Sequence, residues 1–214
     1  MGMSKAAVFI KLENPNDYKL EKIAENFFNS IVSIKDEWQS GFDFRHSNKI
    51  IIEFYKNGIS IVNSDFVNQI LINRDKHLIA KLYKYFNFPE TILVYMHYDS
   101  GDTFGFCYIK CGEINRFRYS LSTDYVTCDF GNPLDEELKV LNSQIHYQED
   151  ENGEEDDFGD IIKYYMYKIE GEAKSRSYHF INSHLTSVVM TAKLGFGLYD
   201  EDTQRAAKFI TLQK

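Results

Sequence analysis

The sequence contains few cysteines, few prolines and no long apolar run. Its 214 residues include only three cysteines and three prolines. An odd, low cysteine count without a secretory signal excludes a disulfide framework and predicts the reducing cytoplasm. The low proline content excludes long Pro-rich linkers, and no apolar run approaches the roughly 20 residues that cross a bilayer. We therefore expect a cytoplasmic protein with no membrane partner.

Positive charge is also scarce. The chain has 24 Lys and Arg against 32 Asp and Glu, a net charge of −8. Contacts to phosphates require clustered Lys and Arg, and no basic stripe occurs, so the composition argues against nucleic-acid binding. The acidic excess is local, because residues 149–160 hold eight carboxylates and no Lys or Arg. Without these eight, 24 acidic residues balance 24 basic ones.

The acidic segment does not fit an EF-hand. That loop requires Gly at its sixth position and a bidentate Glu at its twelfth. With Gly153 as the sixth residue, Gln148 stands first and Gly159 twelfth, so both key ligands are missing. A looser divalent-cation site and a flexible solvated loop are the remaining interpretations. We expect the flexible loop over residues 149–160, and no metal or other cofactor.

Hydrophobic periodicity predicts an α+β fold. Helical spacing recurs in five segments, which are residues 17–35, 64–72, 74–86, 134–141 and 180–194. Strand patterns occupy residues 5–12, 50–55, 59–63 and 207–212, with a central β-meander at about 91–130, whereas residues 161–169 suit either a strand or a helix. We expect a mainly antiparallel sheet with helices packed on one face. It forms either one domain over residues 1–214 or two lobes, 1–90 and 91–214.

Two strands of the meander differ in pattern. Residues 91–98 (TILVYMHY) are apolar on both faces, which predicts a central position in the sheet. Further along, Phe117 and Tyr119 alternate with Arg116 and Arg118. That alternation predicts a strand with one buried face and one solvent-exposed face.

No motif of known catalytic chemistry occurs. A Walker loop and a GxGxxG following a strand are both absent, and His179 and His184 are five residues apart rather than the four of HExxH. Cys107 and Cys111 would lie about 13 Å apart on a strand, too far to share a zinc ion. We expect these two thiols and Cys128 to be buried apolar groups.

Six residues are candidates for binding a ligand or a protein partner. They are His97, Asp99, Asp102, Arg116, Arg118 and Trp38. The meander brings the first five close together, and two arginines on one strand face suit an anionic ligand or the carboxylates of a partner. Trp38 is an aromatic anchor if exposed. The simpler interpretations are a hydrogen-bonded core histidine, an exposed strand face, and a tryptophan that covers the core.

Residues 104–137 also carry a family resemblance. An aromatic strand and a Gly-Glu turn precede an Arg-containing strand, and Asp129-Phe130-Gly131, Pro133-Leu134 and Glu137 follow. This order resembles uncharacterised bacterial α+β domain families of unknown function. The resemblance implies an α+β fold and brings no catalytic residue, cofactor or partner with it.

The leading functional hypothesis is a non-enzymatic interaction or binding protein, immunity-like or regulatory. Its acidic segment would steer it towards a basic protein partner. The alternative is a small-molecule ligand-binding domain or an enzyme whose site lies on the central β-meander, with His97, Asp99, Asp102, Arg116 and Arg118 as its residues. Enzymatic activity and oligomeric state are both left open by the sequence, with the balance against an enzyme.

Overall fold

A computed structural model describes most of the chain. It covers residues 4–28, 32–35, 49–98, 101, 103–121, 126–142, 145–146, 164–169, 172–177, 181–195 and 207–212. The acidic segment at residues 149–160 therefore lies outside the described residues, and so does Trp38. No helix in the described part of the chain is long and apolar enough to cross a membrane.

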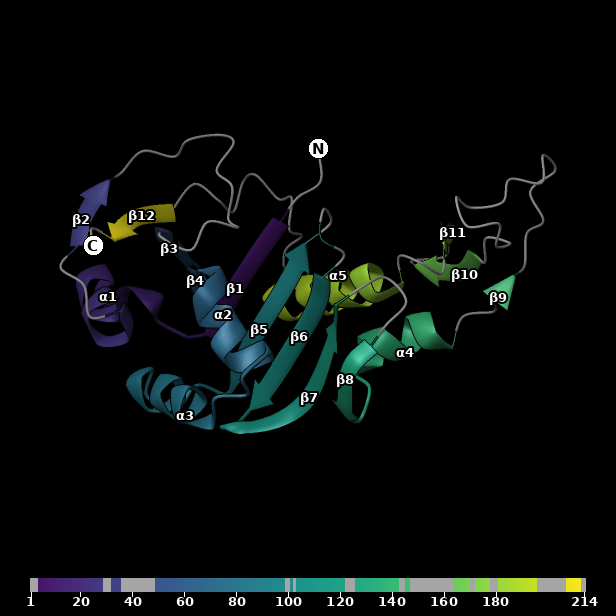
Figure 1. Cartoon of the computed structure of the whole chain (residues 1–214), viewed down its shortest axis with the longest axis horizontal. Helices are drawn as coiled ribbons and strands as arrows, with labels where there is room; N and C mark the ends of the chain where they lie inside the picture. Colours follow the sequence, from purple (N-terminus) through teal and green to yellow (C-terminus); the bar gives the residue numbers. More distant parts are fainter. Residues whose placement is uncertain are drawn as a thin grey trace.

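The centre of the fold is a nine-stranded antiparallel sheet (Figure 1). From edge to edge its strands are β2 (Val32–Lys35), β12 (Ala207–Leu212), β3 (Lys49–Tyr55), β4 (Gly58–Val62), β1 (Ser4–Lys11), β5 (Thr91–Tyr98), β6 (Thr103–Lys110), β7 (Glu113–Ser120) and β8 (Val126–Gly131). The consecutive strands β5 to β8 form the predicted β-meander. Because β1 pairs with β5, a single sheet joins residues on both sides of position 90.

The remaining elements are helices and a small second sheet. The helices are α1 (Leu20–Phe28), α2 (Ser64–Leu71), α3 (Lys76–Tyr85), α4 (Asp135–Leu141) and α5 (Ile181–Leu194), with a 3-10 turn η1 (Pro15–Asp17) before α1. The second sheet has the order β11 (Glu172–Ser177), β10 (Tyr164–Ile169) and β9 (Ile145–His146). In Figure 1 it lies beyond α4, away from the large sheet.

The large sheet is covered on both faces. In β1, Ala6, Val8 and Ile10 contact the core formed with α1, α2 and α3, whereas Ala7 and Phe9 contact a second core formed with α5. Figure 1 accordingly has α2 in front of the sheet and α5 behind it. A strand that is buried on both faces must be apolar at successive positions, as β1 and β5 are.

The α+β class and the antiparallel sheet are therefore confirmed, and β5 is central and buried as predicted. The expectation that the helices pack on one face holds for α1 to α3, but α5 occupies the opposite face. Burial of Val189, Met190 and Leu194 in that second core anchors the helix. Each such side chain contributes about 1.5–3 kcal/mol relative to its exposed state.

A short polar side chain caps the start of α2. Asn63 caps α2, since its Oδ1 accepts from the backbone N–H of Phe66 at 2.8 Å. The helix predicted over residues 17–35 is too long, because α1 ends at Phe28 and residues 32–35 form strand β2. The alternation of β-branched and polar residues in Val-Ser-Ile-Lys favours a strand there.

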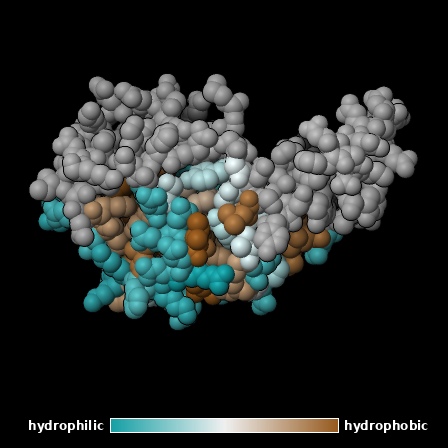
Figure 2. Space-filling model, viewed as in Figure 1, coloured by the Kyte–Doolittle hydropathy of each residue, from teal (hydrophilic) through white to brown (hydrophobic). Residues whose placement is uncertain are grey.

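The surface is mixed in polarity. Figure 2 shows hydrophilic side chains over much of the described part of this face, with hydrophobic side chains in separate small patches. Among the residues whose burial is described, the exposed large apolar ones are Ile72, Phe88, Leu121, Phe130, Leu138 and Leu141. Of these, Phe130 stacks on the buried ring of Phe117 with 5.0 Å between ring centroids, so it is part of the packing at the β8 edge.

Substitution of Gly131, at the end of β8, tests the backbone geometry at the β8 edge of the large sheet. Its φ is +82°, and a Cβ atom would lie 2.3 Å from the carbonyl oxygen of Asn115. We predict that Gly131→Ala lowers the free energy of unfolding by about 2 kcal/mol or more, because both the conformation and the space exclude a side chain. Gly101→Ala is the matched control, since nothing lies within 4 Å of its Cβ position. Urea unfolding measures the stability of both variants. Equal free energies of unfolding for Gly131→Ala and Gly101→Ala would contradict the close approach of Gly131 to Asn115.

Candidate functional site

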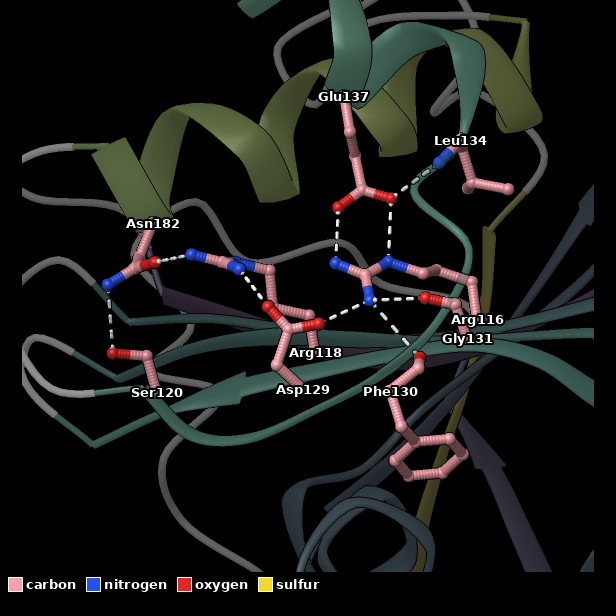
Figure 3. A network of polar contacts seen from close by, with 9 residues as sticks. All are labelled: Arg116, Arg118, Ser120, Asp129, Phe130, Gly131, Leu134, Glu137 and Asn182. Carbon is pink, nitrogen blue, oxygen red and sulfur yellow. Dashed lines mark hydrogen bonds and ion pairs between the residues drawn. The ribbon is translucent and has the colours of Figure 1, made fainter. Parts of the chain in front are cut away.

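Polar side chains converge on the α5 face of the meander. They come from β5, β7, β8, α4 and α5, and Figure 3 shows most of them around two arginines. We refer to them as the polar cluster, which consists of His97, Arg116, Arg118, Ser120, Asp129, Glu137, Asn182 and Ser183. This cluster contains the three sequence-predicted residues that the structure describes.

Arg116 is the largest buried side chain of the cluster, with 2% of its side chain exposed. Its Nε and Nη2 atoms donate to the two carboxylate oxygens of Glu137, each at 2.8 Å. Its Nη1 atom donates to Asp129 and to the carbonyl oxygens of Phe130 and Gly131 (Figure 3). Burial acts to lower the pKa of Arg116, but hydrogen bonds and charge from Glu137 and Asp129 outweigh it and raise that pKa. The guanidinium therefore remains charged.

Glu137 is positioned by the start of α4. It is the third residue of the helix, and its carboxylate also accepts the backbone N–H of Leu134 at 2.8 Å. A carboxylate in the first turn is favoured because the free backbone N–H groups there carry partial positive charge. With no exposed side-chain surface, Glu137 joins the helix start to the guanidinium of Arg116.

Arg118 extends the network to α5. Its Nη1 atom donates to the second oxygen of Asp129, which therefore bridges both arginines (Figure 3). Its Nη2 atom donates to Oδ1 of Asn182 at 2.8 Å, and Nδ2 of Asn182 donates to the hydroxyl of Ser120 at 3.1 Å. These contacts attach the first turn of α5 to strand β7.

His97 and Ser183 form a second contact between the sheet and α5. The Oγ atom of Ser183 lies 2.9 Å from Nε2 of His97. His97 is buried on the central strand β5, and Phe104 packs edge-on against its ring with 5.0 Å between centroids. Because the strand registers pair His97 with Phe104 and Phe104 with Ser120, this contact lies two strands from Ser120, about 10 Å away.

The structure thus places the six candidate residues in different ways. It brings His97, Arg116 and Arg118 onto one face of the meander, whereas Asp99, Asp102 and Trp38 lie outside the described residues. The expectation that Arg116 and Arg118 lie on a solvent-exposed strand face is wrong. Arg116 and Ser120 are buried and Arg118 nearly so, because α4 and α5 cover this part of the sheet.

A second buried ion pair on the same face was not predicted. Lys5 Nζ lies 3.0 Å from Oε2 of Glu53, and the hydroxyl of Tyr55 donates to the same oxygen at 2.8 Å. Burial acts to lower the pKa of Lys5, but the charges and hydrogen bonds of Glu53 and Tyr95 together outweigh it and raise that pKa. The available signal was that Lys5 and Glu53 each interrupt an apolar strand at an inward position.

The three cysteines differ in burial. Cys107 is buried, and this burial raises the pKa of its thiol to about 12, so the thiol stays protonated at neutral pH. Cys111 is exposed and Cys128 is part-exposed, both contrary to expectation, and Cys128 accepts a hydrogen bond from Nη2 of Arg74 at 3.1 Å. Within the described ranges no group of three His, Cys, Asp or Glu side chains is placed to hold a metal ion.

Comparisons of the chain with protein-family models, with curated proteins and with solved structures gave no match. These comparisons therefore identify no function. Both arginines of the cluster are engaged by carboxylates of the same chain. In this arrangement they stabilise the contact of α4 and α5 with the meander.

Substitution of Glu137 tests this structural role. We predict that Glu137→Gln lowers the free energy of unfolding by about 3 kcal/mol, because it leaves the buried Arg116 charge incompletely compensated. Glu136→Gln is the matched control, since Glu136 pairs with Lys193 at 3.0 Å and both side chains are part-exposed. Its cost should be about 1 kcal/mol or less. Urea unfolding at pH 7 measures both variants, and a smaller loss for Glu137→Gln than for Glu136→Gln would refute the assignment.

Proposed function

We propose that this chain is a cytoplasmic interaction protein that binds a basic protein partner, as small immunity proteins bind basic toxins. The immunity comparison is an analogy of charge and size, and the partner is defined here by its positive surface alone. Regulatory binding of another basic protein is the same proposal in chemical terms. No enzymatic activity is needed for it.

The observation that carries the proposal is the distribution of charge. The chain has eight more acidic than basic residues, and residues 149–160 contain eight carboxylates without a single Lys or Arg. Elsewhere in the chain acidic and basic residues are equal in number. The two arginines of the polar cluster, Arg116 and Arg118, are paired with Asp129 and Glu137. The acidic segment is therefore the part of the sequence with the largest uncompensated charge.

Such a segment accelerates association with a basic surface. Opposite charges steer two proteins into encounter and raise the association rate constant, most strongly at low ionic strength. Salt weakens the effect, because the Debye length falls from about 10 Å at 0.1 M to about 3 Å at 1 M. A partner that relies on this segment should therefore dissociate as salt is added.

The alternative function is a ligand-binding or catalytic site on the meander. In this alternative, Arg116 and Arg118 would bind an anionic ligand. Both arginines are paired with carboxylates of the same chain, which weakens their assignment as anion-binding groups. The observation that favours it is the contact of His97 with Ser183, which does not involve either arginine.

Affinity capture from native lysate with two matched variants tests the interaction. In the first variant all eight carboxylates of residues 149–160 become the corresponding amides. In the second variant the order of all twelve residues 149–160 is shuffled, so that the net charge of the segment is retained and its sequence is changed. We predict that the wild type and the shuffled chain retain the same basic partner at about 0.1 M salt and lose it towards 1 M, whereas the amide variant fails to capture it.

Two results would contradict the proposal. One is capture of the same partner by the amide variant at an undiminished level. The other is a partner without an excess of Lys and Arg, retained independently of salt. The measurement uses the full chain, and thermal unfolding of each variant verifies that the fold is unchanged.

A further inference from the structure

The contact of Ser183 with His97 has the geometry of a nucleophile and its general base. A hydroxyl is a weak nucleophile unless a base within about 2.6–3.2 Å takes its proton. The separation of Oγ and Nε2 is 2.9 Å, and the two residues come from elements 86 positions apart in sequence. The ion pairs of Arg116 and Arg118 include neither of these two atoms.

Both partners are held by rigid elements. His97 lies on the central strand β5 between β1 and β6, and the ring of Phe104 packs against its own. Ser183 is the third residue of α5, and the preceding Asn182 is bonded to Arg118 and Ser120 on β7. The sheet therefore fixes the imidazole, and β7 fixes the turn of helix that carries the hydroxyl.

The two residues differ in exposure. Ser183 is part-exposed, whereas His97 is 5% exposed. The serine is therefore the member of the pair that meets solvent, and the imidazole lies in the protein interior.

We propose that Ser183 is a reactive nucleophile, activated by His97, for acyl esters and for related phosphoryl esters. In the reactive tautomer His97 carries its proton on Nδ1, and Nε2 accepts the hydroxyl proton of Ser183. As Oγ bonds to the carbonyl carbon, this proton passes to Nε2. The carbon–oxygen bond to the leaving alcohol then breaks, the alcohol takes the proton from Nε2, and an acyl-serine remains. Water releases the acyl group by the same route in reverse.

Ser183 lies in the first turn of α5. The first four backbone N–H groups of a helix have no acceptor within the helix, and Ser183 is one of these four residues. Under the proposal, the backbone N–H of Ser183 would stabilise the oxyanion of a tetrahedral intermediate. The Ser183–His97 contact, rather than the helix end, defines the site.

Covalent labelling of the full chain with an alkyl fluorophosphonate tests the proposal. Attack of Oγ on phosphorus displaces fluoride, and the serine proton leaves through His97, so one phosphonyl group is added. Intact-mass measurement follows the rate, and peptide mapping locates the modified residue. We predict one modification at Ser183, none in Ser183→Ala, and a rate at least about 100-fold lower in His97→Gln.

Ser187→Ala is the matched control, because Ser187 lies one turn further along α5 and is also part-exposed. It should label at the wild-type rate. Labelling of Ser187 instead of Ser183, absence of labelling in the wild type, or an unchanged rate in a folded His97→Gln would each overturn the proposal. If His97→Gln does not fold, the residue that is labelled in the wild type tests the proposal. Labelling at Ser183 supports it, and labelling elsewhere contradicts it. Partner capture is a separate measurement, so either proposal can fail without the other.

Discussion

The buried guanidinium of Arg116 is the constraint on which this half of the molecule depends. A charge removed from water is costly unless counter-charges and hydrogen bonds replace its hydration. Glu137 from α4, Asp129 from β8 and two backbone carbonyls of β8 provide that replacement. The strand edge and α4 must therefore form together, since either one without the other leaves Arg116 uncompensated.

The same network sets the position of α5. Asp129 links Arg116 to Arg118, and Arg118 holds Asn182 in the first turn of the helix. That turn also carries Ser183, which meets His97 on the central strand. Chemistry at this hydroxyl would consequently depend on ion pairs that do not touch the reacting atoms. The polar cluster is in this sense a support for α4 and α5, and the acidic segment stands apart from it in sequence.

Local patterns predicted much of this fold, and long-range pairing accounts for the rest. The apolar run of residues 91–98 predicted a central strand, and the meander followed from alternation and turn residues. Burial of Arg116 could not be read from its strand, because Asp129 and Glu137 lie 13 and 21 positions away. The contact of His97 with Ser183 was missed for the same reason, as it joins residues 86 positions apart. Continuous apolarity of β1 was the available sign that helices cover both faces of the sheet.

The most direct test is a double-mutant cycle on the buried pair. Arg116→Met and Glu137→Leu are measured separately and together by urea unfolding. We predict that each single variant loses about 3 kcal/mol, because each leaves one buried charge without its partner, and that the double variant loses at least about 2 kcal/mol less than the sum. Additive losses would mean that the two side chains do not stabilise one another, which would contradict the structural role assigned to the polar cluster.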